Sequence, residues 1–398
     1  MPEVNLGLIP GAGGTQRLMR VVGPEQALTM ITSGQHVAVS TLTSSGLFDV
    51  IVDGNDTQEL DAQSIIFAEQ LIAEKNLVPR RIGEMLVNSE GFDWSAAKAN
   101  VIKKARGKEA PVAAFDVLEQ TQAMTISDGM AVERQRFLSL RGSPQSNALI
   151  HAFGAEKQTS KPLKKINAAA QKVSLVGIIG GGNMGSGIAT SFLTANFTVQ
   201  LIEQSSEALA AGLSRIKANF ASNVKRGRMS QIVADTCLAN LDGSVDYQSL
   251  SECDLVLEAV FEDINVKKEL FKKLSKVCRP DTVFATNTSY LDINEIAASI
   301  SRPEQLIGMH FFSPANIMKL LEIVKAEYTS EQVIATAMQV GKQLKKISVL
   351  VGVCFGFAGN RMYTRYGREV QQMLLEGAEV AQIDHAMTSW GMAMGPLA

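Results

Sequence analysis

Residues 173–185 read VSLVGIIGGGNMG, in which a short apolar run leads straight into glycines at positions 180, 182 and 185. The β-branched and aliphatic run predicts a buried strand, and the residues that follow predict a helix. A G-x-G-x-x-G turn between a strand and a helix is typical of a site for the pyrophosphate of a dinucleotide. Gly180 allows the tight turn, Gly182 lets the backbone approach a phosphate, and Gly185 lets the helix pack closely on the strand.

The start of the predicted helix and the end of the next strand complete this candidate cofactor site. Asn183 and Met184 lie in the first helical turn, where free N–H groups face the phosphates. Glu203 ends the apolar run TVQLIE, where a carboxylate can accept hydrogen bonds from an adenosine ribose and disfavours a 2′-phosphate. We therefore expect NAD rather than NADP. The glycine pattern alone is weak evidence, and the alternative is a merely flexible turn.

Further apolar runs alternate with helical segments beyond this turn. The predicted strands are TVQLIE (198–203), DLVLEAV (254–260), TVFATNT (282–288), LIGMHFF (306–312) and LLEIV (320–324). The segment VKKELFKKLSKVC predicts a helix with Val266 on its apolar face and Lys267 largely off that face. This alternation indicates an α/β fold, a Rossmann-type doubly wound and mainly parallel sheet with helices on both faces.

One histidine stands at the C-terminal end of a predicted parallel strand, the edge at which open α/β sheets bind their ligands. This residue is His310, in GMHFFSP, and Glu322 follows on the next predicted strand. A carboxylate that orients one imidazole nitrogen leaves the other free to take a proton from an alcohol, which is the general-base chemistry that hydride transfer needs. Ser289 and Asn360 are candidate donors to the alcohol oxygen. The alternatives are a structural role for His310 and a backbone contact for Asn360.

Composition and charge exclude several other classes of function. The 398 residues carry 38 Lys and Arg against 40 Asp and Glu, a formal charge of −2, which argues against a basic field for nucleic acid or anionic lipid. The four cysteines form no cluster with each other or with histidine, so we expect neither a disulfide framework nor a metal site. No secretory leader or membrane-spanning run is visible, and we expect a soluble, non-secreted protein in a reducing compartment.

The sequence before residue 173 has a different pattern of apolar, polar and glycine residues. Residues 1–60 hold glycine-rich turns, an amphipathic run at 15–22 and a strand candidate at 48–52. Residues 60–165 have apolar residues at helical spacing, and the last part of this stretch becomes basic and polar, which suits a connector. After about residue 353 the pattern turns helical again.

Several motifs in a fixed order carry a resemblance to a known family. IIGGGNMGSGIA, LVLEAVFEDINVKKELF, ATNTS, IGMHFFSPANIMKLLEIV and GFAGNRM resemble the motifs of the 3-hydroxyacyl-CoA dehydrogenases, over about residues 173–398. The resemblance implies that His310 is the catalytic base and Glu322 its carboxylate partner. It also implies that Ser289 and Asn360 contact the hydroxyl and thioester region of the substrate.

The same resemblance implies roles along the cofactor. Glu203 would hold the adenosine ribose, while Glu262 and Lys267 would lie along the nicotinamide side of the groove. One position departs from the pattern: HFFSP has Ser313 where single-function members usually have asparagine. HFFSP resembles the multifunctional, peroxisome-type and related bacterial members, and we expect the shorter serine to keep a hydrogen bond.

The N-terminal stretch resembles a second family, the crotonase or enoyl-CoA hydratase fold. PEVNLGLIPGAGGTQRL is similar to the segment that carries that family's second active-site glutamate, here Glu3. The resemblance implies that the first glutamate and the oxyanion hole lie before Met1, so we expect this part to lack hydratase activity. A hydratase part, a helical connector and a dehydrogenase occur in this order in multifunctional fatty-acid β-oxidation proteins, and we predict a piece of one, truncated at both ends.

These resemblances imply an organisation and a function for the chain. The predicted parts are a crotonase-like part at 1–145, a connector at 146–172, an NAD-binding Rossmann domain at 173–352 and the start of an all-helical domain at 353–398. The predicted function is NAD-dependent oxidation of (S)-3-hydroxyacyl-CoA to 3-oxoacyl-CoA, with an acyl-CoA thioester as substrate. The alternatives are an NAD-binding fragment without turnover and a Rossmann dehydrogenase of a free β-hydroxy acid. The predicted location is the bacterial cytoplasm, with the peroxisome as the alternative, and the sequence does not specify an oligomeric state.

Overall fold

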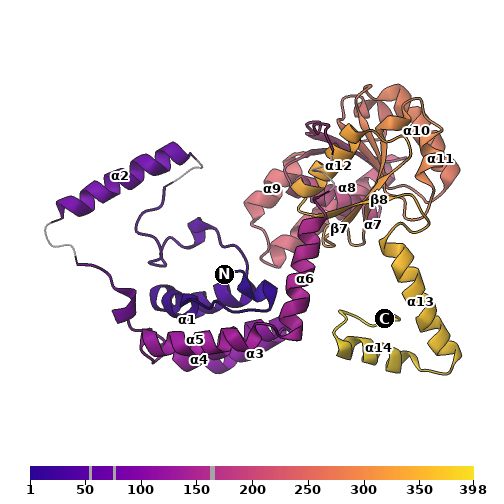
Figure 1. Ribbon diagram of the computed structural model, residues 1–398. Coiled ribbons are helices and arrows are strands. Elements are labelled where there is room, and N and C mark those ends of the chain that lie inside the picture. Colours follow the sequence, from indigo (N-terminus) through magenta and orange to yellow (C-terminus); the bar gives the residue numbers. More distant parts are fainter. Residues whose placement is uncertain (53–55, 75–77, 162–165) are drawn as a thin grey trace. The chain divides into compact units, whose positions relative to one another are not determined.

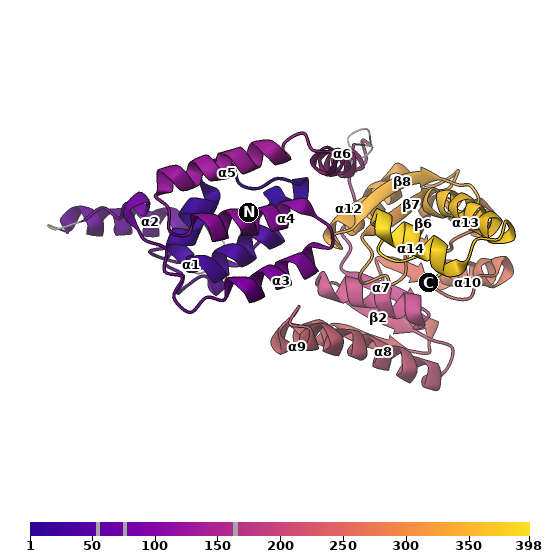
Figure 2. The same cartoon turned by 90° about the horizontal axis from the view of Figure 1, so that it is seen from below.

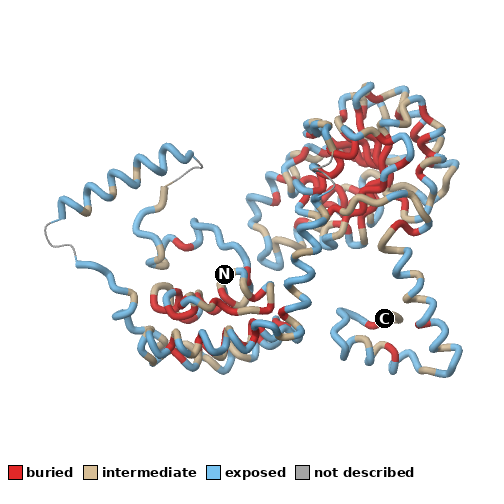
Figure 3. Tube along the Cα trace, in the orientation of Figure 1, coloured by how far each residue is buried: buried red, intermediate tan, exposed pale blue. Residues whose placement is uncertain are grey.

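The computed structural model describes residues 1–52, 56–74, 78–161 and 166–398. Within them the chain divides into two compact units, residues 1–155 and residues 156–398. Each unit has its own core of buried apolar residues (Figure 3). None of the described helices combines the length and the apolar character that crossing a membrane requires.

The described residues of the first unit form α-helices joined by turns, loops and short 3-10 helices. The helices are α1 (Gly14–Ser33), α2 (Thr57–Ala73), α3 (Trp94–Ala105), α4 (Glu109–Thr121), α5 (Ile126–Leu140) and α6 (Pro144–Gln158), the last of which continues past residue 155. Helices α1, α3, α4 and α5 lie together (Figure 1). They share one core, in which Phe115 and Leu118 of α4 are fully buried. α1 is kinked at Gly23, where φ is 78°, because Pro24 has no N–H to donate to the preceding turn.

A buried carboxylate holds the glycine turn that begins α1. Glu133 of α5 accepts hydrogen bonds from the backbone N–H of Gly13 at 2.5 Å and of Thr15 at 2.8 Å. These donors have no partner inside the helix, so the carboxylate satisfies them. Its negative charge also interacts favourably with the positive end of the helix dipole. The PGAGG segment therefore starts a helix that is anchored to α5.

The predicted strand at 48–52 is wrong. The segment forms no strand with any described residue, and Phe48 and Val50 are exposed. A short apolar run becomes a strand only where a neighbouring strand supplies hydrogen bonds, and this unit offers none among its described residues. Helix α2 has the predicted helical spacing, but none of its residues is buried.

Residues 156–398 contain the predicted sheet. Its strands are β1 (Leu175–Ile179), β2 (Thr198–Ile202), β3 (Leu241–Ser244), β4 (Leu255–Glu258), β5 (Val283–Thr286), β6 (Leu306–Phe311), β7 (Leu320–Lys325) and β8 (Ile347–Gly352). The helices are α7 (Asn183–Thr194), α8 (Ser206–Lys225), α9 (Gln231–Ala239), α10 (Ile264–Val277), α11 (Ile293–Ala297), α12 (Glu331–Gln343), α13 (Gly359–Leu375) and α14 (Val380–Trp390).

The strands lie in the order β3-β2-β1-β4-β5-β6-β7-β8. All neighbouring pairs are parallel except β6 and β7, which run antiparallel with His310 directly opposite Glu322. The first strand, β1, lies inside the sheet. β2 and β3 follow towards one edge, and β4 to β8 then follow towards the other. This order puts a topological switch point beside the β1–α7 turn, which is where such sheets bind ligands.

Helices cover both faces of this sheet (Figures 1 and 2). Helices α7, α8, α9 and α12 share one layer of buried residues with it, and α10 and α11 share the other. The central strands are buried on both sides, which explains why they read as continuous apolar runs rather than alternating ones. The predicted α/β class with a mainly parallel sheet is confirmed.

Two local features differ from the sequence prediction. The side chain of Lys267 lies on the buried side of α10 and is 1% exposed, whereas Val266 is 45% exposed. The prediction that Lys267 lies off the buried face is therefore wrong, because two carboxylates compensate its buried charge. Residues 146–158 of the predicted connector form most of α6, and its residues 162–165 lie outside the described part of the chain.

Candidate active site

The glycine turn after β1 is shaped by contacts that exclude side chains at two of the three glycines of the G-x-G-x-x-G pattern, Gly180, Gly182 and Gly185. A Cβ at Gly185 would lie 1.7 Å from the carbonyl oxygen of Gly180, so α7 can pack on the turn only with glycine there. Gly180 has φ of 95°, and a Cβ on it would lie 2.8 Å from the carbonyl oxygen of Ala259. At Gly182, by contrast, a Cβ would meet nothing within 4 Å. The middle glycine therefore borders open space.

The beginning of α7 fits the pyrophosphate of a dinucleotide. Gly182 is the N-cap of this 12-residue helix, and no side chain caps the first turn. The N–H groups of this turn therefore remain available to an anion, and the helix dipole favours one. Asn183 and Met184 lie in this turn as the sequence predicts. The open space at Gly182 and the uncapped helix end together fit NAD.

Glu203 follows β2 beside the same turn. One of its carboxylate oxygens accepts a hydrogen bond from the N–H of Gly181 at 2.5 Å, and the other is 3.2 Å from the N–H of Gln204. The carboxylate thus helps to hold the glycine turn, a contact that the sequence did not predict. Its place at the end of β2 is the one from which a carboxylate reaches a ribose, and that role stays a prediction.

His310 and Glu322 form a buried pair at the end of β6. Nδ1 of the imidazole and Oε2 of the carboxylate are 2.7 Å apart, and both side chains are almost fully buried. The pair arises from the antiparallel register of β6 and β7, which places the two residues opposite each other. Because side chains of directly opposed residues share one face of a sheet, the register itself brings the groups together.

Backbone groups hold the other oxygen of Glu322. Oε1 accepts hydrogen bonds from the N–H of Ala358 at 2.9 Å and of Gly359 at 2.7 Å, at the beginning of α13. Burial acts to raise the pKa of Glu322, but the hydrogen bond with His310 and those from the two backbone groups outweigh it and hold the pKa below its ordinary value. The side chain is therefore a carboxylate at neutral pH.

Ser289 reaches the second nitrogen of the imidazole. Its Oγ lies 3.2 Å from Nε2 of His310, and the rings of Phe312 and Phe357 lie 4.5 Å and 5.8 Å from the imidazole, measured between centroids. Three of the predicted residues, His310, Glu322 and Ser289, are thus brought into one chain of contacts. The aromatic rings limit the positions that the imidazole can take.

Asn360 lies in the first turn of α13, one residue after Gly359, whose N–H binds Glu322. In the described part of the chain its side-chain amide makes no hydrogen bond to His310, Glu322 or Ser289. The structure therefore places Asn360 next to the pair without joining it to the contacts. Ser313, two residues after the end of β6, is exposed and precedes a cis proline, and it makes no hydrogen bond to another described residue.

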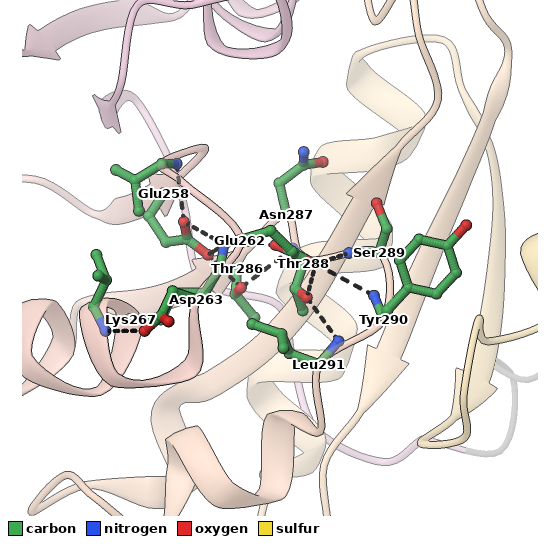
Figure 4. A network of polar contacts seen from close by, with 12 residues as sticks. Glu258, Glu262, Asp263, Lys267, Thr286, Asn287, Thr288, Ser289, Tyr290 and Leu291 are labelled. Carbon is green, nitrogen blue, oxygen red and sulfur yellow. Dashed lines mark hydrogen bonds and ion pairs between the residues drawn. The ribbon is translucent and has the colours of Figure 1, made fainter.

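Buried Lys267 and the partly exposed Glu262 meet in a polar network that reaches Ser289 (Figure 4). Nζ of Lys267 lies 3.2 Å from Oε2 of Glu262 and within 2.8 Å and 2.9 Å of the two oxygens of Glu258. Glu258 is completely buried at the end of β4, and sequence reasoning missed it. The available signal was an acidic residue inside the apolar run LVLEAV, since a carboxylate there needs a buried partner.

Glu3 lies apart from this site, in the other unit. It begins the short 3-10 helix Glu3–Leu6, and its Oε2 is buried without a hydrogen-bond partner among the described residues. No group of three or more His, Cys, Asp or Glu side chains in the described residues could hold a metal ion.

Taken together, a doubly wound sheet, a glycine turn under an uncapped helix and a carboxylate-backed histidine at the sheet edge define the class of NAD-dependent dehydrogenases. Residues 175–354 match the family model described as 3-hydroxyacyl-CoA dehydrogenase, NAD binding domain, and residues 356–398 match that of its C-terminal domain. The chain belongs to the 3-hydroxyacyl-CoA dehydrogenase family. Residues 1–93 match the model described as enoyl-CoA hydratase/isomerase.

Individual relatives agree with this assignment. The chain is similar to the structure of (S)-3-hydroxybutyryl-CoA dehydrogenase PaaH1 from Ralstonia eutropha, with 31% identity, a TM-score of 0.55, and coverage of 57% of this chain and 81% of that one. It is 37% identical to the peroxisomal bifunctional enzyme of Cavia porcellus and 36% identical to a glyoxysomal fatty acid beta-oxidation multifunctional protein of Cucumis sativus. These alignments cover 99% and 100% of this chain and 55% of each relative. The chain thus spans about half the length of the curated relatives it matches.

Proposed function

We propose that this chain oxidises (S)-3-hydroxyacyl-CoA to 3-oxoacyl-CoA with NAD⁺, as one step of fatty-acid β-oxidation. The observation that carries the proposal is the hydrogen-bonded pair of His310 and Glu322, whose outer nitrogen contacts Ser289. Membership in the 3-hydroxyacyl-CoA dehydrogenase family supports the substrate class.

The geometry assigns the protons of the pair. An ionised carboxylate only accepts hydrogen bonds, so Nδ1 of His310 carries a hydrogen that it donates to Glu322. In the neutral imidazole Nε2 then has a free lone pair, and Ser289 donates its hydroxyl hydrogen to it. Nε2 is therefore the atom that takes a proton.

These residues can carry out the proton half of an alcohol oxidation. Nε2 of His310 removes the hydroxyl proton, and the carboxylate of Glu322 stabilises the imidazolium that forms. Ser289, released from Nε2, donates a hydrogen bond to the substrate oxygen and fixes its position. Bound NAD⁺ would supply the hydride acceptor, and the residues that would hold it are Gly182, the first turn of α7 and Glu203.

An assay of the reverse reaction tests this proposal. Acetoacetyl-CoA and NADH are mixed with the chain, and the loss of NADH absorbance is followed. We expect turnover that falls at least about a thousandfold in His310→Ala while NADH fluorescence still reports binding. His151→Ala, an exposed histidine of α6, serves as the matched control and should keep the wild-type rate.

Other outcomes decide against the proposal. NADH binding without turnover by the wild-type chain would favour the NAD-binding fragment without activity. Oxidation of free 3-hydroxybutyrate as fast as its thioester would favour a dehydrogenase of free β-hydroxy acids. Equal rates for the wild-type chain and His310→Ala would show that His310 is not the catalytic base.

We also propose the domain boundaries that the sequence predicts, at 145–146, 172–173 and 352–353, and a peroxisomal location. The family matches change at residues 354–356, close to the predicted boundary at 352–353, and the hydratase match ends at residue 93. The names of the relatives place those proteins in peroxisomes or glyoxysomes, which supports the peroxisomal alternative over the bacterial cytoplasm. The proposed substrate is an acyl-CoA thioester.

A further inference from the structure

Glu258 is a buried ionisable residue with no part in the reaction described above. It ends β4, is completely buried, and accepts hydrogen bonds from Lys267, from the hydroxyl of Thr286 and from the N–H of Val260. Burial raises the pKa of Glu258 against the opposing effect of Lys267. A buried carboxylate and a buried ammonium are costly unless each compensates the other, so the pair requires a reason beyond packing.

Lys267 passes the contact on to Glu262. Its Nζ lies between Glu258 and Glu262, at 2.8 Å from an oxygen of the first and 3.2 Å from an oxygen of the second. The side chain of Glu262 is partly exposed, and Lys267 pairs with its Oε2, which leaves Oε1 free for other donors. Lys267 in turn is fixed by both oxygens of Glu258.

Glu262 then holds the turn that carries Ser289 (Figure 4). Its Oε1 accepts hydrogen bonds from the hydroxyl of Thr288, from the N–H of Ser289 at 2.8 Å and from the N–H of Tyr290 at 3.4 Å. Three consecutive residues of the turn are thus bound to one oxygen. The hydroxyl of the middle residue, Ser289, is the one that reaches His310.

We propose that Glu258 is a positioning residue for the catalytic base, which acts through Lys267 and Glu262 to hold Ser289 against His310. The kinetic part of this inference rests on the proposed dehydrogenase function, whereas the structural part does not. Three groups face the carboxylate of Glu258: the ammonium of Lys267, the hydroxyl of Thr286 and the N–H of Val260. Glutamine in its place would remove the negative charge that holds the ammonium of Lys267. Lys267 would then turn towards Glu262 and draw that carboxylate away from Ser289.

The direct test observes the imidazole of His310 in the folded chain. The chain has four histidines, so ¹⁵N-histidine labelling gives a spectrum in which the His310→Gln variant identifies the resonances of His310. Ser289→Ala shows the shift of the Nε2 resonance that loss of the serine contact causes. We expect Glu258→Gln to move the same resonance in the same direction, by at least about half of that shift.

Two further variants make the result decisive. Glu295→Gln removes an exposed carboxylate of α11 that pairs at 2.7 Å with Lys268, the residue after Lys267, and it should leave the His310 resonance unchanged. If Glu258→Gln does not fold, the double variant Glu258→Gln with Lys267→Met removes both buried charges, a change that proteins often tolerate. A folded variant of either kind with the wild-type His310 resonance overturns the proposal.

Kinetics test the same path by a double-mutant cycle. Glu258→Gln should lower kcat/KM about tenfold in the wild-type chain but less than about twofold in a chain that already carries Ser289→Ala. Equal factors in both backgrounds would mean that Glu258 acts independently of Ser289, which contradicts the proposal. If the wild-type chain shows no turnover, the proposed function fails, and the His310 resonance still decides this inference.

Discussion

The exchange Glu322→Gln tests how the base is prepared, because it changes one charge and almost no volume. The carboxylate of Glu322 accepts three hydrogen bonds, one from Nδ1 of His310 and two from the N–H groups of Ala358 and Gly359. A glutamine can keep its oxygen on the two backbone donors. Its N–H₂ group must then point at Nδ1, which forces that nitrogen to accept and puts the ring hydrogen on Nε2.

The wrong tautomer has a calculable consequence. With a hydrogen on Nε2 the imidazole cannot take the substrate proton, and the same exchange in a carboxylate–histidine pair of known mechanism costs on the order of ten thousandfold in kcat. We therefore expect Glu322→Gln to lower kcat with acetoacetyl-CoA and NADH by about three to four orders of magnitude. Binding of NADH, measured by fluorescence, should stay within about twofold of wild type because the glycine turn is untouched.

A matched control separates this effect from a general loss of charge. Glu327→Gln changes an exposed glutamate just beyond the end of the same strand, β7, and should keep the wild-type rate. If Glu322→Gln keeps more than about a tenth of the wild-type kcat while it remains folded, His310 does not depend on the carboxylate for its tautomer and the reasoning is refuted.

Three further results are expected. Gly185→Ala should lower the free energy of unfolding by about 2–3 kcal/mol because its Cβ would meet the carbonyl of Gly180, whereas Gly182→Ala should leave thermal unfolding unchanged and weaken NADH binding about tenfold; equal stability losses would contradict the contacts at this turn. Glu203→Ser should reduce the preference for NADH over NADPH at least about tenfold in fluorescence titrations, and an unchanged ratio would show that the carboxylate does not face the ribose. The pKa of Glu322 is depressed in the folded chain, so its contribution to stability is fully present above the ordinary value of 4.5 and is lost as the pH falls below it; urea unfolding should show the difference between wild type and Glu322→Gln shrinking over that range.

The sheet could be predicted where its strands are buried on both faces. The runs that became β1, β2, β4, β5, β6 and β7 are rich in apolar residues, and each was predicted within a few residues of its bounds. β3 was missed because its sequence, LDGS, has one apolar residue, and an edge strand needs no more than one neighbour. β8 was missed although its sequence, ISVLVG, is an apolar run, and as the other edge strand it is mostly half-buried.

The site divides in the same way. His310 and Glu322 were predicted on successive strands, and their contact follows from the register of those strands, which a hydrophobic pattern can indicate. Lys267 was placed on the wrong side of α10 because periodicity assigns every lysine to the solvent. A buried lysine depends on carboxylates that come from elsewhere in the fold, here the end of β4 and the loop before α10, and a periodicity argument contains no such information.

The two oxygens of Glu322 have different partners. One faces the imidazole of His310, and the other accepts hydrogen bonds from backbone groups at the beginning of α13. A rigid displacement of α13 would pull on the carboxylate and so on the tautomer of His310. The ability of His310 to accept a proton therefore depends on the position of α13. Any event that moves this helix would change the catalytic rate.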